Sequence, residues 1–397
     1  MTDHISHTRR RILKLSALFT AAGAAPLLGT LNNALAAEPS APVRVGYLPI
    51  TDAAPLLIAH QNQLWQKQGL EVEKPRMFRS WAQVVEAFLS GQVNVVHMLS
   101  PMSVYARYGS RSPSKIVAWN HVDGSSIAVA ARADFKEIKD LGGTTIAIPF
   151  WYSIHNIILQ HLFKKEGLEA IGEGTPNSKQ VKLVVMAPSD MLPALATGRV
   201  AGYIVAEPFV ALSEIQNIGR VLRFTGDVWK EHACCVVLMH EHDLEKRSEW
   251  SQKVVNGIVE AQAWTRDNRE ETARLLSRSG PEKYTPHTED TLAKVLAPAA
   301  DANAFYESTG AIRHKEWDSH RIDFQPYPYP SYTERMVELL KETYMEGNRD
   351  FLADLDPAFV AKDLVDDRFV KNAINRVGGM KVFGQPETFS RTEVIDA

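Results

Sequence analysis

The chain has 397 residues, of which 45% are hydrophobic and 23% are charged, and its formal net charge is −3 at neutral pH. This composition is that of a soluble globular protein, and the length suits two domains. The mildly acidic balance, with no basic run beyond the N-terminus, argues against binding to nucleic acid.

The first 37 residues have the pattern of an export signal. Three arginines at residues 9–11 precede Ile12, Leu13 and Lys14, then a weakly apolar stretch, and then an alanine-rich end at residues 34–37. This arrangement resembles a twin-arginine signal with a small-residue cleavage site, and a membrane anchor is the disfavoured alternative. Since no cysteine follows the apolar stretch, we expect no lipidation of a mature N-terminal cysteine. We predict a soluble periplasmic protein that is exported already folded.

From Val43 the chain shows the first copy of a repeated β-α-β-α-β pattern. A predicted strand, VRVGYLP, leads through the loop ITDAAP into a helical stretch that Gly69 is placed to cap, and then into the strand-like EVEKPRMF. A second helix is predicted over residues 81–90. The strand after it, over residues 93–98, ends next to Ser100 and Pro101.

The second copy starts at the β-branched run of residues 145–148. The aromatic loop FWYSIHN follows, and after it come a helix and the strand VKLVVM. A helix over residues 190–197 then leads to a strand over residues 200–205, which is followed by Glu207. Two details match the first copy, KQGLEVE against KKEGLEA and LSGQVNVVHMLSP against ATGRVAGYIVAEP. Two matches in the same order indicate an internal repeat.

Each copy predicts a parallel sheet with helices on both faces and a ligand crevice at the carboxyl ends of its strands. We therefore expect an α/β fold of two lobes that face each other across a cleft. His155 lies in the first turn of its helix, where free N–H groups and the helix dipole favour an anionic or polar ligand. The alternative is that the aromatic residues pack in a core or lid and that His155 is a solvated turn residue. The predicted cleft residues are Thr51, Asp52 and Ser100 from one lobe, and Trp151, Tyr152, His155 and Glu207 from the other.

Several segments resemble the solute-binding proteins of ATP-driven importers for nitrate, bicarbonate and sulfonates. These are VRVGYLPITDAAPLLIAHQNQLWQKQGLEVE, SWAQVVEAFLSGQVNVVHMLSPM, NHVDGSSIAVA, PFWYSIHNIILQHLFKKEGL and TGDVWKEHACCVVL. The resemblance implies a two-lobed periplasmic binding protein of the type II topology, with mainly parallel sheets flanked by helices. Such a protein closes by a hinge on a small polar or anionic solute and delivers it to the permease and ATPase subunits of an ABC importer. The resemblance implies no chemistry on the solute, and we expect a monomer with no catalytic residues, no cofactor and no metal.

By this resemblance, Trp81 and His155 contact the solute, and Ser125 and Ser126 lie in the cleft. The nitrate and bicarbonate binders carry Gln where this chain has Ser125, and Lys where it has the sequence ACC at residues 233–235. The missing cation and the missing long donor count against nitrate or bicarbonate itself. The aromatic loop instead suits a solute with an apolar or π-bearing portion, so a larger aromatic or heterocyclic solute, similar to the thiamine pyrimidine, is the alternative.

Cys234 and Cys235 are neighbours in the chain, and their Cα atoms, about 3.8 Å apart, are too close for an unstrained disulfide. The simplest interpretation is two small buried residues in a strand. A related branch of the superfamily makes the thiamine pyrimidine with a cysteine-rich segment and a histidine, which leaves an enzyme as a further alternative that the export signal disfavours. A metal site around His232, His240 and His242 lacks a third ligand on one strand face and is disfavoured.

The remainder of the chain is predicted to be mainly helical, with a break at the Pro/Tyr segment of residues 324–330. The predicted domains are a signal at residues 1–37, a first lobe at 43–130 plus 235–345, a second lobe at 131–234, and a C-terminal extension at 346–397 that packs on the surface.

Overall fold

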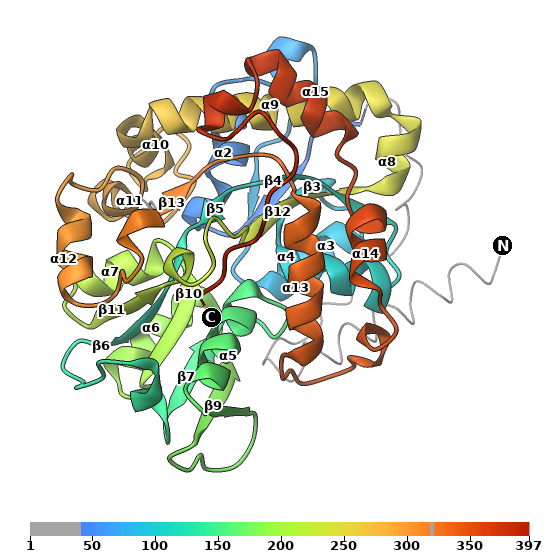
Figure 1. Ribbon diagram of the computed structural model, residues 1–397. Coiled ribbons are helices and arrows are strands. Elements are labelled where there is room, and N and C mark those ends of the chain that lie inside the picture. The colour runs from blue at the N-terminus through green and yellow to red at the C-terminus, as the bar shows by residue number, and fades with distance from the viewer. Residues whose placement is uncertain (1–40, 318–320, 397) are drawn as a thin grey trace.

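The computed structural model describes residues 41–317 and 321–396. The predicted export signal lies outside the described residues. Figure 1 shows the two larger sheets in different parts of the molecule, one in the upper and one in the lower part of the view, with helices around both. This is the mixed α/β fold with parallel-rich sheets that the repeat predicts.

The first sheet has the strand order β2-β1-β3-β12-β4. Strand β1 is parallel to β2 and β3, while β12 is antiparallel to β3 and β4. Strand β12 follows the strands of the second sheet in the chain. It inserts between β3 and β4 and so brings the chain back to the first sheet. The strands are β1 (Val45–Tyr47), β2 (Arg76–Met77), β3 (Val95–Leu99), β4 (Ser114–Trp119) and β12 (Cys235–His240).

The second sheet has the order β11-β6-β10-β7-β9-β8. Strands β10, β7, β9 and β8 are parallel, and β6 is antiparallel to β10 and β11. The strands are β6 (Ser125–Ala130), β7 (Thr145–Ile148), β8 (Glu169–Ile171), β9 (Gln180–Val185), β10 (Gly202–Ala206) and β11 (Gly219–Phe224). A separate two-stranded ribbon pairs β5 (Val122–Asp123) with β13 (Ile322–Asp323).

The helices follow the predicted repeat. Those of the first lobe and the C-terminal part are α2 (Ala54–Gln61), α3 (Trp81–Leu89), α4 (Ser100–Val104), α8 (Glu241–Lys246), α9 (Ser248–Asp267), α10 (Arg269–Leu276), α11 (Glu289–Leu296), α12 (Ala302–Ser308), α13 (Pro330–Glu342), α14 (Pro357–Leu364) and α15 (Arg368–Val377). Those of the second lobe are α5 (Ile154–Lys165), α6 (Pro188–Ala196) and α7 (Phe209–Ile215). Shorter helical turns are η1 (Thr51–Ala53), η2 (Gln66–Gln68), η3 (Tyr105–Gly109), η4 (Ile138–Leu141), η5 (Thr225–Asp227), η6 (Lys315–Trp317), η7 (Asp350–Leu352) and η8 (Met380–Phe383).

The first helix of the repeat is shorter than its sequence pattern predicts. It ends at Gln61, and Gln63 adopts a left-handed φ of 55° before the separate turn η2. A non-glycine residue in this region interrupts helical geometry. Gly69 does cap the following turn, with φ 80°.

The boundary between the lobes also differs from the predicted one. Strand β6, which was expected in the first lobe, pairs with β10 and β11 in the second sheet. The chain therefore crosses between the lobes at residues 120–124 and returns at residues 225–234. These two crossovers lie at the centre of the molecule.

The C-terminal segment does more than cover the surface. Helix α15 packs against α9, and α14 packs against α13 and β4, so that Val360, Phe369 and Ile374 are buried in the core. The last residues then run back to the middle of the molecule (Figure 1), where Ile395 forms a bridge with Trp229 of the second crossover. The tail thus spans both lobes.

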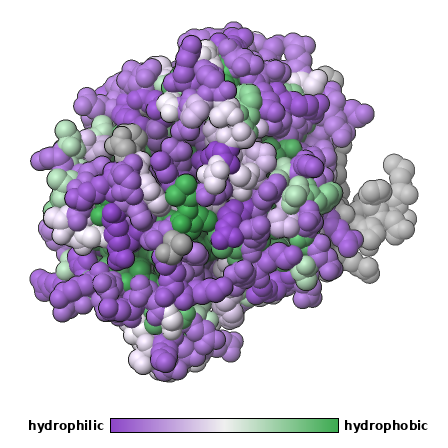
Figure 2. Space-filling view, viewed as in Figure 1, coloured by the Kyte–Doolittle hydropathy of each residue, from purple (hydrophilic) through white to green (hydrophobic). Residues whose placement is uncertain are grey.

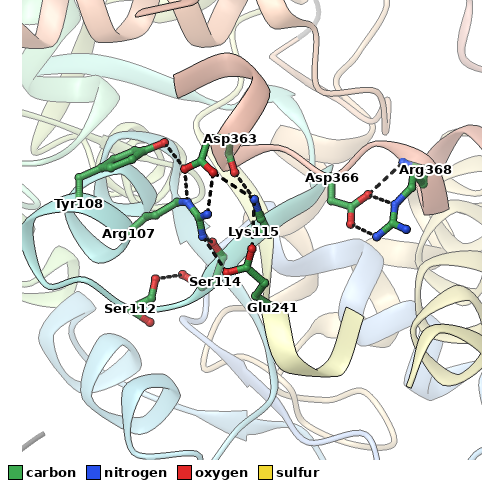
Figure 3. Close-up of polar contacts among 9 residues, drawn as sticks. All are labelled: Arg107, Tyr108, Ser112, Ser114, Lys115, Glu241, Asp363, Asp366 and Arg368. Carbon is green, nitrogen blue, oxygen red and sulfur yellow. Dashed lines mark hydrogen bonds and ion pairs between the residues drawn. The ribbon is translucent and has the colours of Figure 1, made fainter. Parts of the chain in front are cut away.

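An ionic cluster ties α14 to the first sheet (Figure 3). The Asp363 carboxylate accepts hydrogen bonds from Arg107 Nε at 2.5 Å and from the Tyr108 hydroxyl at 2.8 Å. Lys115 of β4 lies 3.5 Å from the same carboxylate and 3.3 Å from Glu241. The Arg107 guanidinium holds the pKa of Asp363 well below its usual range, although partial burial opposes this.

On the face shown in Figure 2 the surface is mostly hydrophilic, and apolar atoms form separate patches. The large apolar side chains that are exposed belong to different elements: Met77, Ile215, Phe305, Phe359 and Val394. Within the described residues, none of the helices combines the length and the apolar character needed to cross a membrane.

Candidate site between the lobes

Four chemically reactive side chains meet where the crossovers join the first sheet. Asp52 lies in η1, just after β1, and His121 follows β4 in the first crossover. Cys234 and Cys235 come at the end of the second crossover, where β12 begins. All four side chains are fully buried. Their potential ligand atoms lie within 4.8 Å of one another.

The contacts inside this cluster are close. Nε2 of His121 lies 2.8 Å from Oδ2 of Asp52, and the amide nitrogen of Cys235 lies 3.2 Å from the same Nε2. The two cysteines are free thiols whose Sγ atoms are 3.9 Å apart. Among the described residues, none donates a well-directed hydrogen bond to either carboxylate oxygen of Asp52.

Burial and mutual interaction shift the acidity of these groups. Burial raises the pKa of Asp52 to about 6. For His121, burial favours the neutral ring, but the charges of Asp52 and Cys234 outweigh it and raise the pKa to about 10. Burial alone would also raise the pKa of Cys234, yet the neighbouring thiol and the rings of His155 and His121 lower it well below its usual range. The pKa of Cys235 is raised by burial and by Cys234. The cluster therefore favours one thiolate next to an imidazolium.

The second lobe contributes His155 and Ser125. Ser153 caps α5, accepting a hydrogen bond from the Asn156 amide at 3.1 Å, and this places His155 in the first helical turn. Its Nε2 lies 2.9 Å from Oγ of Ser125, the first residue of β6. The same Nε2 lies 3.8 Å from Sγ of Cys234. His155 therefore connects the second lobe with the cysteine pair.

Trp81 lies on the side of the first lobe. Ser80 caps α3 and makes Trp81 its first residue, as predicted. The Trp81 side chain is only 2% exposed, and its ring centroid lies 5.3 Å from that of His97 in β3. Nε2 of His97 accepts the Leu48 amide N–H at 2.8 Å. Burial lowers the pKa of His97 to about 3, so the ring is neutral.

Thr51 and Glu207 form a second contact between the lobes. The Glu207 carbonyl accepts the amide N–H of Thr51 at 2.9 Å and its hydroxyl at 3.1 Å. The buried Glu207 carboxylate accepts a hydrogen bond from Arg321 Nε at 2.7 Å and one from Ser126 at 3.4 Å. Burial raises the pKa of Glu207, although the charge of Arg321 opposes this. In this structure Glu207 and Ser126 therefore take part in an ion-pair network that includes Glu214.

Ser100, Trp151 and Tyr152 contact the C-terminal part of the chain. Oγ of Ser100 lies 2.9 Å from the Tyr332 hydroxyl. Trp151 packs edge-on against Tyr344, and Tyr152 stacks on Phe351 while its hydroxyl donates to the Asn348 carbonyl. The aromatic loop thus supports the C-terminal segment in this structure.

A cavity of about 380 Å³ adjoins this region. Its lining includes Asp123, Ser125 and Arg321, together with residues of α11 and α12. That volume is within the range of small-molecule sites.

The structure brings Asp52, Trp81, Ser125 and His155 to one region, whereas the other predicted residues lie in the two neighbouring contact networks. The sequence patterns did not identify His97 and His121 as site residues. The available signal was their position, because His97 lies within the buried strand β3 and His121 lies just after β4. His240, considered with the disfavoured histidine metal site, instead stacks on Phe88 at 4.0 Å between ring centroids.

Comparison with known proteins found a matching family model and similar curated proteins. The model of the NMT1-like family matches residues 36–277. A nitrate/nitrite binding protein, NrtA, from Nostoc sp. is 25% identical over 314 residues, which cover 73% of this chain and 68% of that protein.

Solved structures agree in fold. The periplasmic nitrate-binding protein NrtA from Synechocystis superposes with a TM-score of 0.69 at 18% identity, covering 88% of this chain and 92% of that one. The alkanesulfonate-binding protein SsuA from Xanthomonas axonopodis, bound to MOPS, gives a TM-score of 0.56 at 16% identity and covers 85% and 99%. The predicted resemblance and the periplasmic-binding-protein fold are both confirmed.

Proposed function

The chain belongs to the NMT1-like family, and from that premise we propose that it is the solute-binding component of an ABC importer. It captures a small polar or anionic solute between its lobes and delivers it to the permease and ATPase subunits. It acts as a binding protein and performs no chemistry on the solute.

One observation carries this proposal. The His155–Ser125 pair of the second lobe faces Cys234, where the chain re-enters the first sheet, and all three residues are buried. Polar side chains that meet from two lobes are what a closing cleft needs to hold a polar solute. The adjoining cavity of about 380 Å³ supports a small solute.

Location and export belong to the same proposal. Binding components of this class work outside the cytoplasmic membrane. The arginine-rich pattern of residues 9–14 supports export by the twin-arginine route, which delivers folded proteins to the periplasm. We also propose that the protein works there as a monomer.

The test is a binding screen on the mature protein with nitrate, bicarbonate, alkanesulfonates and aminopyrimidines. A solute that binds only the native state stabilises it by about 2.7 kcal/mol at a hundredfold excess over Kd, which raises the midpoint of thermal unfolding. We expect one of these chemical classes to do so, and small-angle scattering to show a smaller radius of gyration with the solute bound.

A pair of histidine variants then locates the site. His155→Ala should weaken binding of that solute at least tenfold, measured by calorimetry. His242→Ala is the matched control, because His242 is exposed on α8. Equal affinity in the two variants, or no stabilisation by any of the four classes, would contradict the proposal.

A further inference from the structure

We propose that Asp52, His121, Cys234 and Cys235 form a metal site for a divalent transition-metal ion that prefers thiolate and imidazole ligands, with Zn²⁺ as the probe ion. This is a resident ion that holds the two crossovers together, and the site does not depend on which solute the cleft captures.

The donor set selects the kind of ion. Two sulfur atoms, one imidazole nitrogen and one carboxylate oxygen make a borderline-soft set, which suits Zn²⁺ and chemically similar ions. Ca²⁺ and Mg²⁺ require mainly oxygen ligands and would not be retained. Four ligands from the chain complete a tetrahedral shell, the arrangement typical of structural zinc sites.

The distances suit a tetrahedral ion. Bonds of about 2.0–2.3 Å at tetrahedral angles place ligand atoms about 3.3–3.8 Å apart. The Sγ atoms of Cys234 and Cys235 are 3.9 Å apart, close to the upper value. Nε2 of His121 and Oδ2 of Asp52, at 2.8 Å, need to separate by roughly 0.5 Å to admit the ion. The remaining ligand pairs lie within 4.8 Å.

The burial of the Asp52 side chain is a further observation that fits a cation site. It is fully buried, and no described residue donates a well-directed hydrogen bond to its two carboxylate oxygens. Burying a carboxylate is costly even beside the His121 ring, whose Nε2 lies 2.8 Å from Oδ2. A cation bound between Asp52 and the thiols would add a second favourable interaction to the one that the carboxylate makes with His121.

The position of the cluster gives the ion a role. His121 belongs to the first crossover, Cys234 to the second, and Asp52 to the turn after β1. An ion shared by these three would fix both crossovers to the first lobe. Because His155 lies 3.8 Å from Cys234, the ion would also position the thiolate that faces the second lobe.

Cobalt provides a direct test on the mature, metal-free protein. A thiolate bound to Co²⁺ gives an intense charge-transfer absorption in the near ultraviolet, and the chain has only two cysteines. We expect one Co²⁺ per chain with this absorption, displaced by one equivalent of Zn²⁺ and unaffected by Ca²⁺ or Mg²⁺. Binding without the thiolate absorption, or no binding at a stoichiometric level, would overturn the proposal.

Variants assign the ligands. Cys234→Ser and His121→Gln should each weaken Co²⁺ binding at least tenfold, whereas His242→Ala should bind as the parent does. Protection of the thiols needs no variant: one equivalent of Zn²⁺ should slow alkylation of the parent protein by iodoacetamide at least tenfold. Equal alkylation rates with and without Zn²⁺ would exclude the cysteines as ligands, even if the substituted chains fail to fold.

Discussion

Sγ of Cys234 lies 3.8 Å from Nε2 of His155, which joins the end of a crossover to the first turn of a helix in the other lobe. The two residues are 79 positions apart in the chain. Because Cys234 lies in the second crossover and His155 in the second lobe, this contact ties the crossover to the first turn of α5.

The orientation of the His155 ring depends on Ser125. Ser125→Ala removes the 2.9 Å partner of Nε2 and leaves a buried ring nitrogen without it, so the free energy of unfolding should fall by about 1–2 kcal/mol. Urea denaturation measures the change. Ser189→Ala, at an exposed position in α6, should change stability by less than about 0.5 kcal/mol. Equal stability of the two variants would show that this hydrogen bond contributes little.

The Arg321 side chain should contribute strongly to stability. It is buried and pairs with Glu207 at 2.5 Å and Glu214 at 2.9 Å. Arg321→Met leaves the buried Glu207 carboxylate without this cation and should cost about 3–5 kcal/mol in denaturant unfolding. The exposed pair of Arg335 with Glu338 supplies the control, since Arg335→Met should cost at most about 1 kcal/mol.

A double substitution separates the ion pair from the packing of Arg321. Glu207→Gln combined with Arg321→Met should cost less than the sum of the two single changes, because the second substitution removes the charge that the first leaves unpaired. Strict additivity would mean that the two side chains act independently.

The lowered pKa of Asp363 should make the stability of the fold depend on pH. Arg107 lowers the pKa of Asp363 in the folded chain, so its stabilising contribution is complete above the unfolded value of about 4 and is lost as the pH falls toward the folded value. Asp363→Asn should therefore lower the free energy of unfolding by about 2 kcal/mol at pH 7. The difference from the parent should shrink progressively below about pH 4.

Asp354→Asn is the control for this prediction, because Asp354 is exposed on the same segment. Its stability should follow that of the parent at every pH. A gap between parent and Asp363→Asn that stays constant from pH 7 to pH 3 would contradict the assigned role of the carboxylate.

Export should require the arginine pair. Replacing Arg9 and Arg10 by Lys should leave precursor in the cytoplasm, because the twin-arginine pathway recognises that pair. Arg11→Lys keeps the pair and should be exported normally. Cell fractionation with immunoblotting measures both, and periplasmic accumulation of the double variant at the parent level would refute the assignment.

Local sequence patterns were enough to predict the two β-α-β-α-β units and the starts of α3 and α5. Ser80 and Ser153 cap α3 and α5, and both signals lie within one helical turn of the residues they position. The opening residue Trp81 and the first-turn residue His155 could therefore be placed from sequence. The aromatic loop could be located but not its partners, Tyr344 and Phe351, because nearly two hundred residues separate them.

The cluster of Asp52, His121 and the two cysteines depends on tertiary structure. Asp52 and His121 are brought together because β1 and β4 belong to one sheet, and the cysteines join them only because β12 inserts between β3 and β4. Hydrophobic periodicity gives the direction of each side chain along its own strand, but it does not give the order in which strands pair. Strand order was therefore decided by packing of the whole chain, and with it the group of residues that meet between the lobes.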